Sequence, residues 1–317
     1  MKLTEYIEQS KETLFSFEIL PPLKGGSIEG LFNRIEPLME FKPSFVDVTY
    51  HREEFVMRQR PDGTYNKVSI RKRPGTVAIC AAIMHRFQVE AVPHIICGGF
   101  TRDETENALI DLHFLGIDNV LAIRGDNERG ERNFNPEQGG NKNALELIRQ
   151  IDDMNNGIYL DEELKNPTPT NFCIGAAGYP EKHIDAMNLD NDLNFLKQKV
   201  EAGAEFITTQ MFFDNQRYFE FVDRCRKEGI NVPIIPGIKP ITRKKQMYNL
   251  PKIFNIDIPV ELSLEMEKTK TDEAAYKVGI EWCIQQCKEL KANGVPVLHF
   301  YTMGLSKATK EVASQVF

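Results

Sequence analysis

The chain has 317 residues, of which 41% are hydrophobic and 27% charged, a composition that predicts a globular protein with a sizeable core. Its net charge of −7 argues against a nucleic-acid-binding protein. The N-terminus lacks an apolar leader and no run of about 18 apolar residues occurs, so neither a secretory signal nor a membrane-spanning helix is expected. We therefore expect a cytoplasmic protein that binds neither nucleic acid nor membrane.

The six cysteines do not form a metal-binding pattern. Only Cys283 and Cys287 lie close together, four residues apart in a helical stretch, and no second pair matches them. We expect buried free thiols and no metal site, a usage typical of the reducing cytosol.

Short apolar runs predict eight strands. They are Leu14–Leu20, Phe45–Tyr50, Val92–Cys97, Val120–Arg124, Phe172–Ala177, Phe206–Phe212, Val232–Ile238 and Val297–Tyr301. The patterns between them predict amphipathic helices. These are Arg102–Leu115, Asn143–Met154, Asp190–Ala202, Gln216–Glu228, Arg243–Leu250 and Thr271–Ala292, with a last one at Ser306–Phe317. The helix at Arg243–Leu250 is expected to stop before Pro251, which disrupts a helix.

Strands that alternate with helices run parallel, and eight such units favour a closed (β/α)8 TIM-type barrel over an open sheet. Three polar stretches are predicted as loops on this scaffold: Pro61–Gly75, Gly130–Asn141 and Gly157–Thr170. Binding function concentrates in such loops, at the C-terminal ends of barrel strands.

Side-chain alternation along the strands predicts which residues face inward. We expect the bulky apolar residues to face the outer helices, including Leu121 and Ile123 in the fourth strand. The polar or small residues of the opposite face then converge at the C-terminal strand ends. They are Glu18, Thr49, Arg124, Asp126 and Gln210. Polar groups inside a barrel cost free energy unless they are paired or used, which makes this set a candidate pocket.

Two of these residues are carboxylates with different sequence neighbours. Glu18 lies among apolar residues and prolines, which predicts a raised pKa and the role of an acid. Asp126 follows Arg124 and Gly125, so it is expected to stay ionised and to stabilise positive charge.

Seven segments, in order along nearly the whole chain, resemble motifs of the methylenetetrahydrofolate reductases. They are Ser16–Pro22 (SFEILPP), Val48–Tyr50 (VTY), Ala122–Asp126 (AIRGD), Ala176–His183 (AAGYPEKH), Ala202–Asp214, Ile234–Ile238 (IIPGI) and His299–Thr302 (HFYT). Each motif alone is weak, but seven in the family's order are a strong indication.

The resemblance implies one flavin-binding barrel domain over 1–317, without the regulatory domain of larger members. It implies an oxidoreductase in which NADH or NADPH reduces bound FAD, and methylenetetrahydrofolate then takes the hydride and leaves as 5-methyltetrahydrofolate for methionine synthesis. By the same resemblance, the short single-domain form is expected to prefer NADH as its electron donor. Glu18 and Asp126 match the family's catalytic residues, and both, with Gln210, match its folate contacts. Nine positions match its FAD contacts: Thr49, His94, Arg124, Gly125, Asp126, Tyr179, His183, Asp192 and Lys199.

Structural roles remain open for several of these residues. His94 could be a buried structural histidine, His183 a solvated loop residue, Asp192 a helix cap and Lys199 part of a solvated helix face. Arg124 and Asp126 could pair with other barrel residues. The chain also departs from the family after His94, at His51, and in a longer basic loop at Asn66–Pro74.

Two other functions fit the same pattern. One is a flavin-free barrel lyase or hydrolase that uses Glu18 and Asp126 as an acid–base pair. The other is a flavin- or folate-binding protein without catalysis, which would not need Glu18. A Rossmann dehydrogenase is disfavoured because no glycine fingerprint follows the first strand. The sequence leaves a homo-oligomer open.

Overall fold

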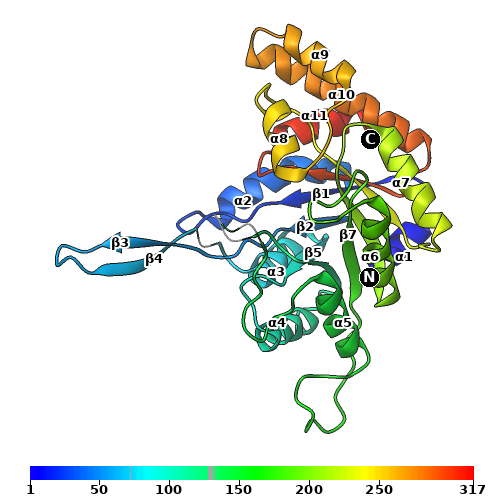
Figure 1. The fold of residues 1–317 in the computed structure, drawn as a ribbon. Coiled ribbons are helices and arrows are strands. Elements are labelled where there is room, and N and C mark those ends of the chain that lie inside the picture. Colours follow the sequence, from blue (N-terminus) through cyan, green and yellow to red (C-terminus); the bar gives the residue numbers. More distant parts are fainter. Residues whose placement is uncertain (72, 128–130, 132) are drawn as a thin grey trace.

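A computed structural model describes residues 1–71, 73–127, 131 and 133–317, and its centre is a closed barrel of parallel strands (Figure 1). The barrel strands are β1 (Leu14–Ile19), β2 (Phe45–Val48), β5 (Glu90–Ile96), β6 (Asn119–Ile123), β7 (Cys173–Gly178), β8 (Ala204–Met211), β9 (Ile234–Ile238) and β10 (Val297–Tyr301). Their order round the barrel follows the sequence, and β1 pairs with β10 to close it. This confirms the (β/α)8 barrel and all eight predicted strands.

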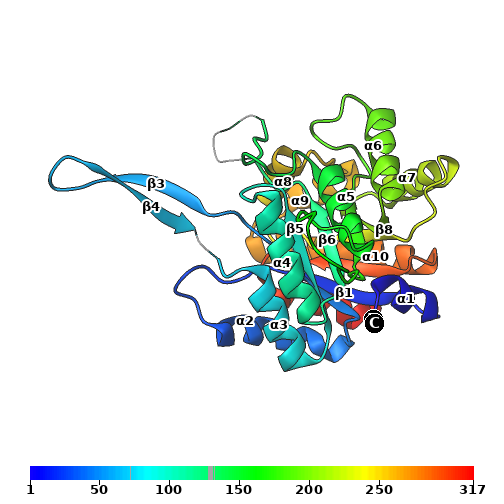
Figure 2. The ribbon, with the colours of Figure 1, turned by 90° about the horizontal axis from the view of Figure 1, so that it is seen from below.

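Helices cover the outside of the barrel (Figures 1 and 2). They are α1 (Leu3–Gln9), α2 (Ile28–Ile35), the 3-10 helix η1 (Glu36–Phe41), α3 (Thr76–Phe87), α4 (Arg102–Phe114), α5 (Ala144–Asn155), α6 (Leu189–Glu201), α7 (Asn215–Lys227), α8 (Gln246–Phe254), α9 (Val260–Lys268), α10 (Asp272–Ala292) and α11 (Ser306–Val316). Among the described residues, no helix is both long and apolar enough to cross a bilayer.

The barrel interior is filled in layers. The lowest layer is apolar and consists of Leu3, Phe45, Val92, Leu121, Cys173, Phe206, Ile235 and Val297. The next layer contains buried polar side chains, among them Ser16, Asp47, His94 and His299. Leu3 seals the N-terminal end, where its N–H donates to Asn119 Oδ1 at 2.7 Å. The N-terminal end of the barrel is thus closed, whereas the strands present polar side chains toward the C-terminal end.

The predicted strand faces are confirmed in β1, β2 and β8, where Phe15, Phe17, Val46, Val48 and Ile207 pack outward. The prediction for β6 is wrong: Leu121 and Ile123 pack into the interior layer, while Ala122 packs outward. Because β6 is apolar on both faces, hydrophobicity alone does not choose between them. Pairing decides it, since the register sets Leu121 opposite the inward-facing His94 of β5.

The segment after β2 differs most from expectation. Part of the predicted basic loop forms a two-stranded antiparallel hairpin of β3 (Glu54–Gln59) and β4 (Tyr65–Arg71), outside the barrel sheet. Figures 1 and 2 both show it projecting from the barrel. Lys72, in the same predicted loop, lies outside the described residues, as do Gly130 and Arg132 in the second one.

The region after β9 also differs. Helix α8 does not stop before Pro251 but continues to Phe254, and α9 follows it although no helix was expected there. Pro251 removes only one backbone donor from a short helix, whereas burial of Met247 and Leu250 holds the helix in place. Asn255, with a left-handed φ of 52°, ends it by donating its N–H to the Pro251 carbonyl.

Candidate active site

The predicted site residues gather round the C-terminal end of the barrel. Glu18, His94 and Gln210 lie in strands β1, β5 and β8, whereas Thr49, Arg124 and Tyr179 directly follow β2, β6 and β7. Parallel strands bring these positions to one rim. Asp192 and Lys199 reach the same rim from α6. The structure thus assembles these predicted residues from seven separate segments.

A buried cluster surrounds Glu18. His94 Nε2 lies 3.4 Å from Asp47 Oδ2 and 3.9 Å from Glu18 Oε2, so the imidazole stands between two carboxylates. His299 Nε2 lies 3.7 Å from the same Asp47 oxygen, and its Nδ1 hydrogen-bonds Ser16 Oγ at 2.9 Å. The Thr302 hydroxyl donates to the Glu18 carbonyl at 2.7 Å, which ties the β1 end to the residue after β10.

Burial raises the pKa of Glu18 to about 7; the nearby His94 opposes this shift, and the Asp47 carboxylate adds to it. Burial disfavours charge on His94 too, but the hydrogen bond to Asp47 and the two carboxylates prevail and raise the pKa of His94. Burial lowers the pKa of His299. Near neutral pH, Glu18 can therefore hold a proton and release it, as a general acid must.

Asp47 and His299 were not among the predicted site residues. Strand alternation already placed Asp47 on the inward face between two valines, and His299 opens the HFYT motif. Neither signal indicated a contact with Glu18, because that contact requires β2 and β10 to lie on either side of β1.

Substitution of His94 by glutamine should raise the pKa of Glu18 further, because a cation that favours its ionised form is removed. The alkaline limb of the pH–rate profile for a reaction step that uses the Glu18 proton should then move to higher pH. The measurement is a single-turnover rate against pH, with His113→Gln on the outer helix α4 as the matched control. If the alkaline limb stays at the same pH or moves to lower pH, the assigned effect of His94 on the pKa of Glu18 is wrong.

Arg124 and Asp126 lie beyond β6 rather than on its inward face. Arg124 Nη1 pairs with Asp185 Oδ2 at 2.6 Å, and its guanidinium lies 5.2 Å from the Phe134 ring centroid. Asp126 is exposed at the rim. Between them, Gly125 has φ +85°, and a Cβ there would lie 3.3 Å from Ile96 Cβ. Glycine thus permits both the turn and the close approach to β5.

The loop after β7 is held by α6. Asn188 caps this helix, so Asp192 is free of that role and instead accepts the His183 backbone N–H at 2.8 Å. The His183 ring meets Tyr179 edge-on at 4.6 Å between centroids. Lys199 is not on a solvated face: its Nζ donates to the Ala177 carbonyl at 3.2 Å, and burial lowers its pKa.

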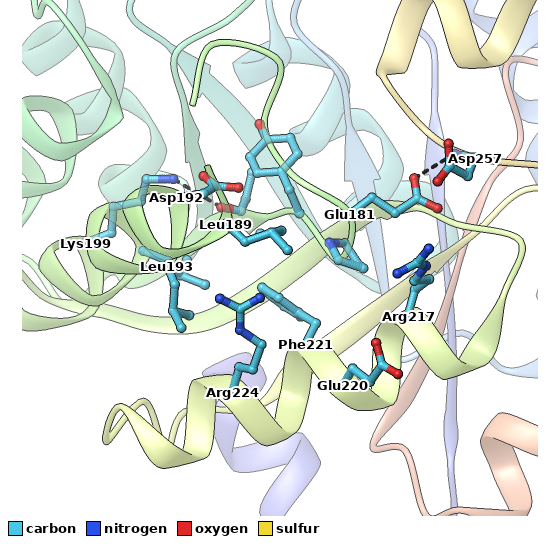
Figure 3. Close-up of a pocket in the computed structure, with 15 residues that line it drawn as sticks. Glu181, Leu189, Asp192, Leu193, Lys199, Arg217, Glu220, Phe221, Arg224 and Asp257 are labelled. Atoms are coloured by element: carbon cyan, nitrogen blue, oxygen red, sulfur yellow. Dashed lines mark hydrogen bonds between the residues drawn. The ribbon is translucent and has the colours of Figure 1, made fainter. Parts of the chain in front are cut away.

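A cavity of about 250 Å³ lies between this loop, α6 and α7 (Figure 3). Tyr179, Asp192 and Lys199 line it, with Arg217 and Arg224 reaching in from α7. Glu18 and Gln210 are not among its lining residues, so this hollow belongs to the outer part of the site rather than to the catalytic cluster. Gln210 is half-buried on β8, and its side-chain oxygen accepts the Met211 N–H at 2.9 Å.

The rim has unused hydrogen-bonding capacity that suits a large polar cofactor. The Thr49 hydroxyl, the Thr208 hydroxyl, Arg124 Nε and His299 Nε2 are buried without a hydrogen-bond partner among the described residues. Buried polar groups are normally satisfied, so these atoms can accept a partner from a bound ligand or from water. With the basic side chains of Arg124 and Lys199 nearby, the set fits a polar, anionic ligand.

Comparisons with known proteins agree with this geometry. Residues 2–316 match the family model described as methylenetetrahydrofolate reductase. A Salmonella typhimurium 5,10-methylenetetrahydrofolate reductase is 34% identical over 289 residues, which cover 91% of this chain and 85% of that protein. An Arabidopsis thaliana methylenetetrahydrofolate reductase (NADH) is 33% identical over 97% of this chain. The chain spans about half the length of such larger relatives, 49% for the Arabidopsis protein.

Two solved structures share the fold at low identity. A Clostridium thermocellum protein described as binding two copies of 5-methyl-5,6,7,8-tetrahydrofolic acid has a TM-score of 0.62 at 12% identity, covering 99% of this chain and 98% of that one. Oxaloacetate acetylhydrolase has a TM-score of 0.53 at 11% identity, covering 97% and 82%. At such identities the likeness concerns the barrel alone. The family model and the bacterial relatives are specific, and this chain belongs to the methylenetetrahydrofolate reductase family.

Proposed function

We propose that the chain reduces 5,10-methylenetetrahydrofolate to 5-methyltetrahydrofolate, with NADH as the electron donor. The observation that carries the proposal is Glu18, a carboxyl at the barrel mouth whose side chain is only 13% exposed and whose pKa is raised to about 7. Reduction of this folate requires an acid at a carbon–nitrogen bond that has to break, and a proton available at neutral pH supplies it.

The protein's own part in the reaction is to move one proton and to stabilise one charge. Glu18 protonates N10 as the N10–methylene bond breaks, which leaves a cationic iminium at N5. Asp126, which is exposed at the rim, would stabilise that cation through space. Gln210 would hydrogen-bond the pterin ring and orient it. A hydride then adds to the methylene carbon, and solvent reprotonates Glu18, so one NADH and one proton are consumed for each methyl group formed.

We propose that FAD would bind across the rim, where it would supply hydride-transfer chemistry between NADH and the folate. Arg124 and Lys199 would offer positive charge to its pyrophosphate, and Gly125 would let the backbone approach the ring system. Thr49, His94, Asp126, Tyr179, His183 and Asp192 are the other residues proposed to hold it. The name of the Arabidopsis relative supports NADH, whereas a Caenorhabditis elegans relative, 32% identical, is named as a probable NADPH enzyme.

One anaerobic cuvette tests the proposal. Flavin absorbance in the purified protein should bleach on addition of NADH and return when methylenetetrahydrofolate is added. Bleaching without return would mean that the protein is a flavoenzyme but does not use methylenetetrahydrofolate as its electron acceptor. A colourless protein that takes up no added FAD would instead favour a flavin-free lyase or hydrolase that uses Glu18 and Asp126. Comparing NADH with NADPH at equal concentration tests the donor.

The folate half-reaction should depend on pH through Glu18. Only the protonated carboxyl can act as the acid, so the rate should be constant well below pH 7 and fall with rising pH as the proton is lost. Above the pKa, the decline should approach about tenfold for each pH unit. Reduction of the flavin by NADH does not use this proton and serves as the internal control. A rate that stays level to pH 9 would contradict the assignment.

A further inference from the structure

The hairpin of β3 and β4 is the part of the molecule that neither the barrel nor the candidate site explains. Its strands pair only with each other and project from the body (Figures 1 and 2). Strands of six and seven residues give it a reach of about 20 Å. A two-stranded hairpin in water is at best marginally stable without a packed face. We therefore expect the hairpin to pack against another protein surface, which would stabilise it.

One face of the hairpin is suited to such packing. The pairing register puts Met57 opposite Lys67 and Gln59 opposite Tyr65, and Phe55 lies two residues before Met57 on the same side. The exposed fractions of Phe55, Met57 and Tyr65 are 47%, 61% and 61%. Lys67 Nζ lies 4.1 Å from the Phe55 ring centroid. The face is thus apolar with a basic margin, a combination found at protein interfaces.

The charge of the hairpin indicates what covers it. Residues 54–71 contain four basic side chains and two acidic ones, a net charge of +2, in a chain whose total is −7. The remainder of the chain therefore carries −9. Two hairpins would repel each other, whereas a hairpin and the body of another copy attract. A two-fold axis would repeat the contact. The dimer interface would then bury the surface of two hairpins, twice the area that one hairpin buries.

We propose that the hairpin is an arm that docks on the acidic body of a second copy of this chain, and that exchange of two such arms forms a dimer. The docking face consists of Phe55, Met57, Tyr65 and Lys67. The partner surface lies on the barrel body and not on the partner's hairpin. This inference does not depend on the proposed enzymatic reaction.

Light scattering after size-exclusion chromatography tests the arm on the full chain. The wild type should have at least twice the monomer mass, and a variant with Phe55→Ser, Met57→Ser and Tyr65→Ser should have the monomer mass. A second variant, Arg58→Glu with Lys67→Glu, should also be monomeric, because it reverses the charge and retains the apolar side chains. Both variants should keep the wild-type circular dichroism, since the hairpin lies outside the barrel.

The matched control is Phe114→Ser with Leu115→Ser at the end of α4, where 85% and 48% of these side chains are exposed. It removes comparable exposed apolar surface and should leave the mass unchanged. A monomeric wild type would overturn the proposal and would leave the arm for a different acidic partner. An oligomer that survives both hairpin variants would overturn it as well. Neither result would bear on flavin reduction or folate turnover.

Discussion

Replacing Glu18 by glutamine should abolish folate reduction while leaving reduction of the bound flavin by NADH nearly unchanged. Glutamine keeps the shape of the side chain but cannot give up a proton at neutral pH, so N10 would leave unprotonated. A positioned general acid contributes about 10²–10⁴-fold to a rate, and the folate half-reaction should slow by that factor. The two half-reactions can be followed separately by anaerobic stopped-flow absorbance of the flavin.

The matched control is Glu90→Gln. Glu90 is also a glutamate on a barrel strand with little exposure, 18% for its side chain against 13% for Glu18. It lies at the opposite, N-terminal end of the barrel, where it pairs with the terminal amine of Met1 at 3.3 Å. The same chemical change there should leave both half-reactions intact. If Glu18→Gln lost both half-reactions while folded and loaded with flavin, its role as the acid would be wrong.

Replacing Phe206 by alanine should produce the largest loss of stability. Its ring is fully buried in the lowest interior layer, against the space over Gly175, where a Cβ would overlap that ring. Truncating a buried phenylalanine costs about 3–5 kcal/mol, because the cavity left behind only partly collapses. The melting temperature should fall by about 5–8 °C, as measured by circular dichroism.

Phe114→Ala is the control for this substitution, because 85% of the Phe114 side chain is exposed at the end of α4. Surface substitutions of this kind change the free energy of unfolding by about 0.5 kcal/mol or less. A loss below about 1 kcal/mol at Phe206 would mean that the interior rearranges to fill the space. The barrel interior would then be less rigid than its layered packing suggests.

Much of the fold was predictable because its signals are local. Strands and helices alternate along the chain, and this pattern occurs eight times. All eight barrel strands form within a few residues of the predicted bounds. The inward position of Glu18 followed from alternation along β1, where Phe15 and Phe17 occupy the other face. The raised pKa of Glu18 was also predicted. Burial is its main cause, and the charged groups that act on it are His94 and Asp47.

Other features needed the closed barrel. The motif residues selected Arg124 and Lys199, but only the structure shows Arg124 paired with Asp185 and Lys199 turned to the Ala177 carbonyl. The hairpin lacks the apolar alternation by which the barrel strands were recognised, since its arginines and lysine interrupt the pattern. Cross-strand pairing, not burial, forms it.

The sequence by itself determined the class of fold, the family and the side chains that can carry the chemistry, because those depend on periodicity and on residue identity. The tertiary structure decided which face of β6 lies inside and which groups surround Glu18. His299 follows Ser16 by 283 residues, and the two touch only because β1 pairs with β10. A pKa depends on such neighbours and on the loss of water, and both arise only when the barrel closes.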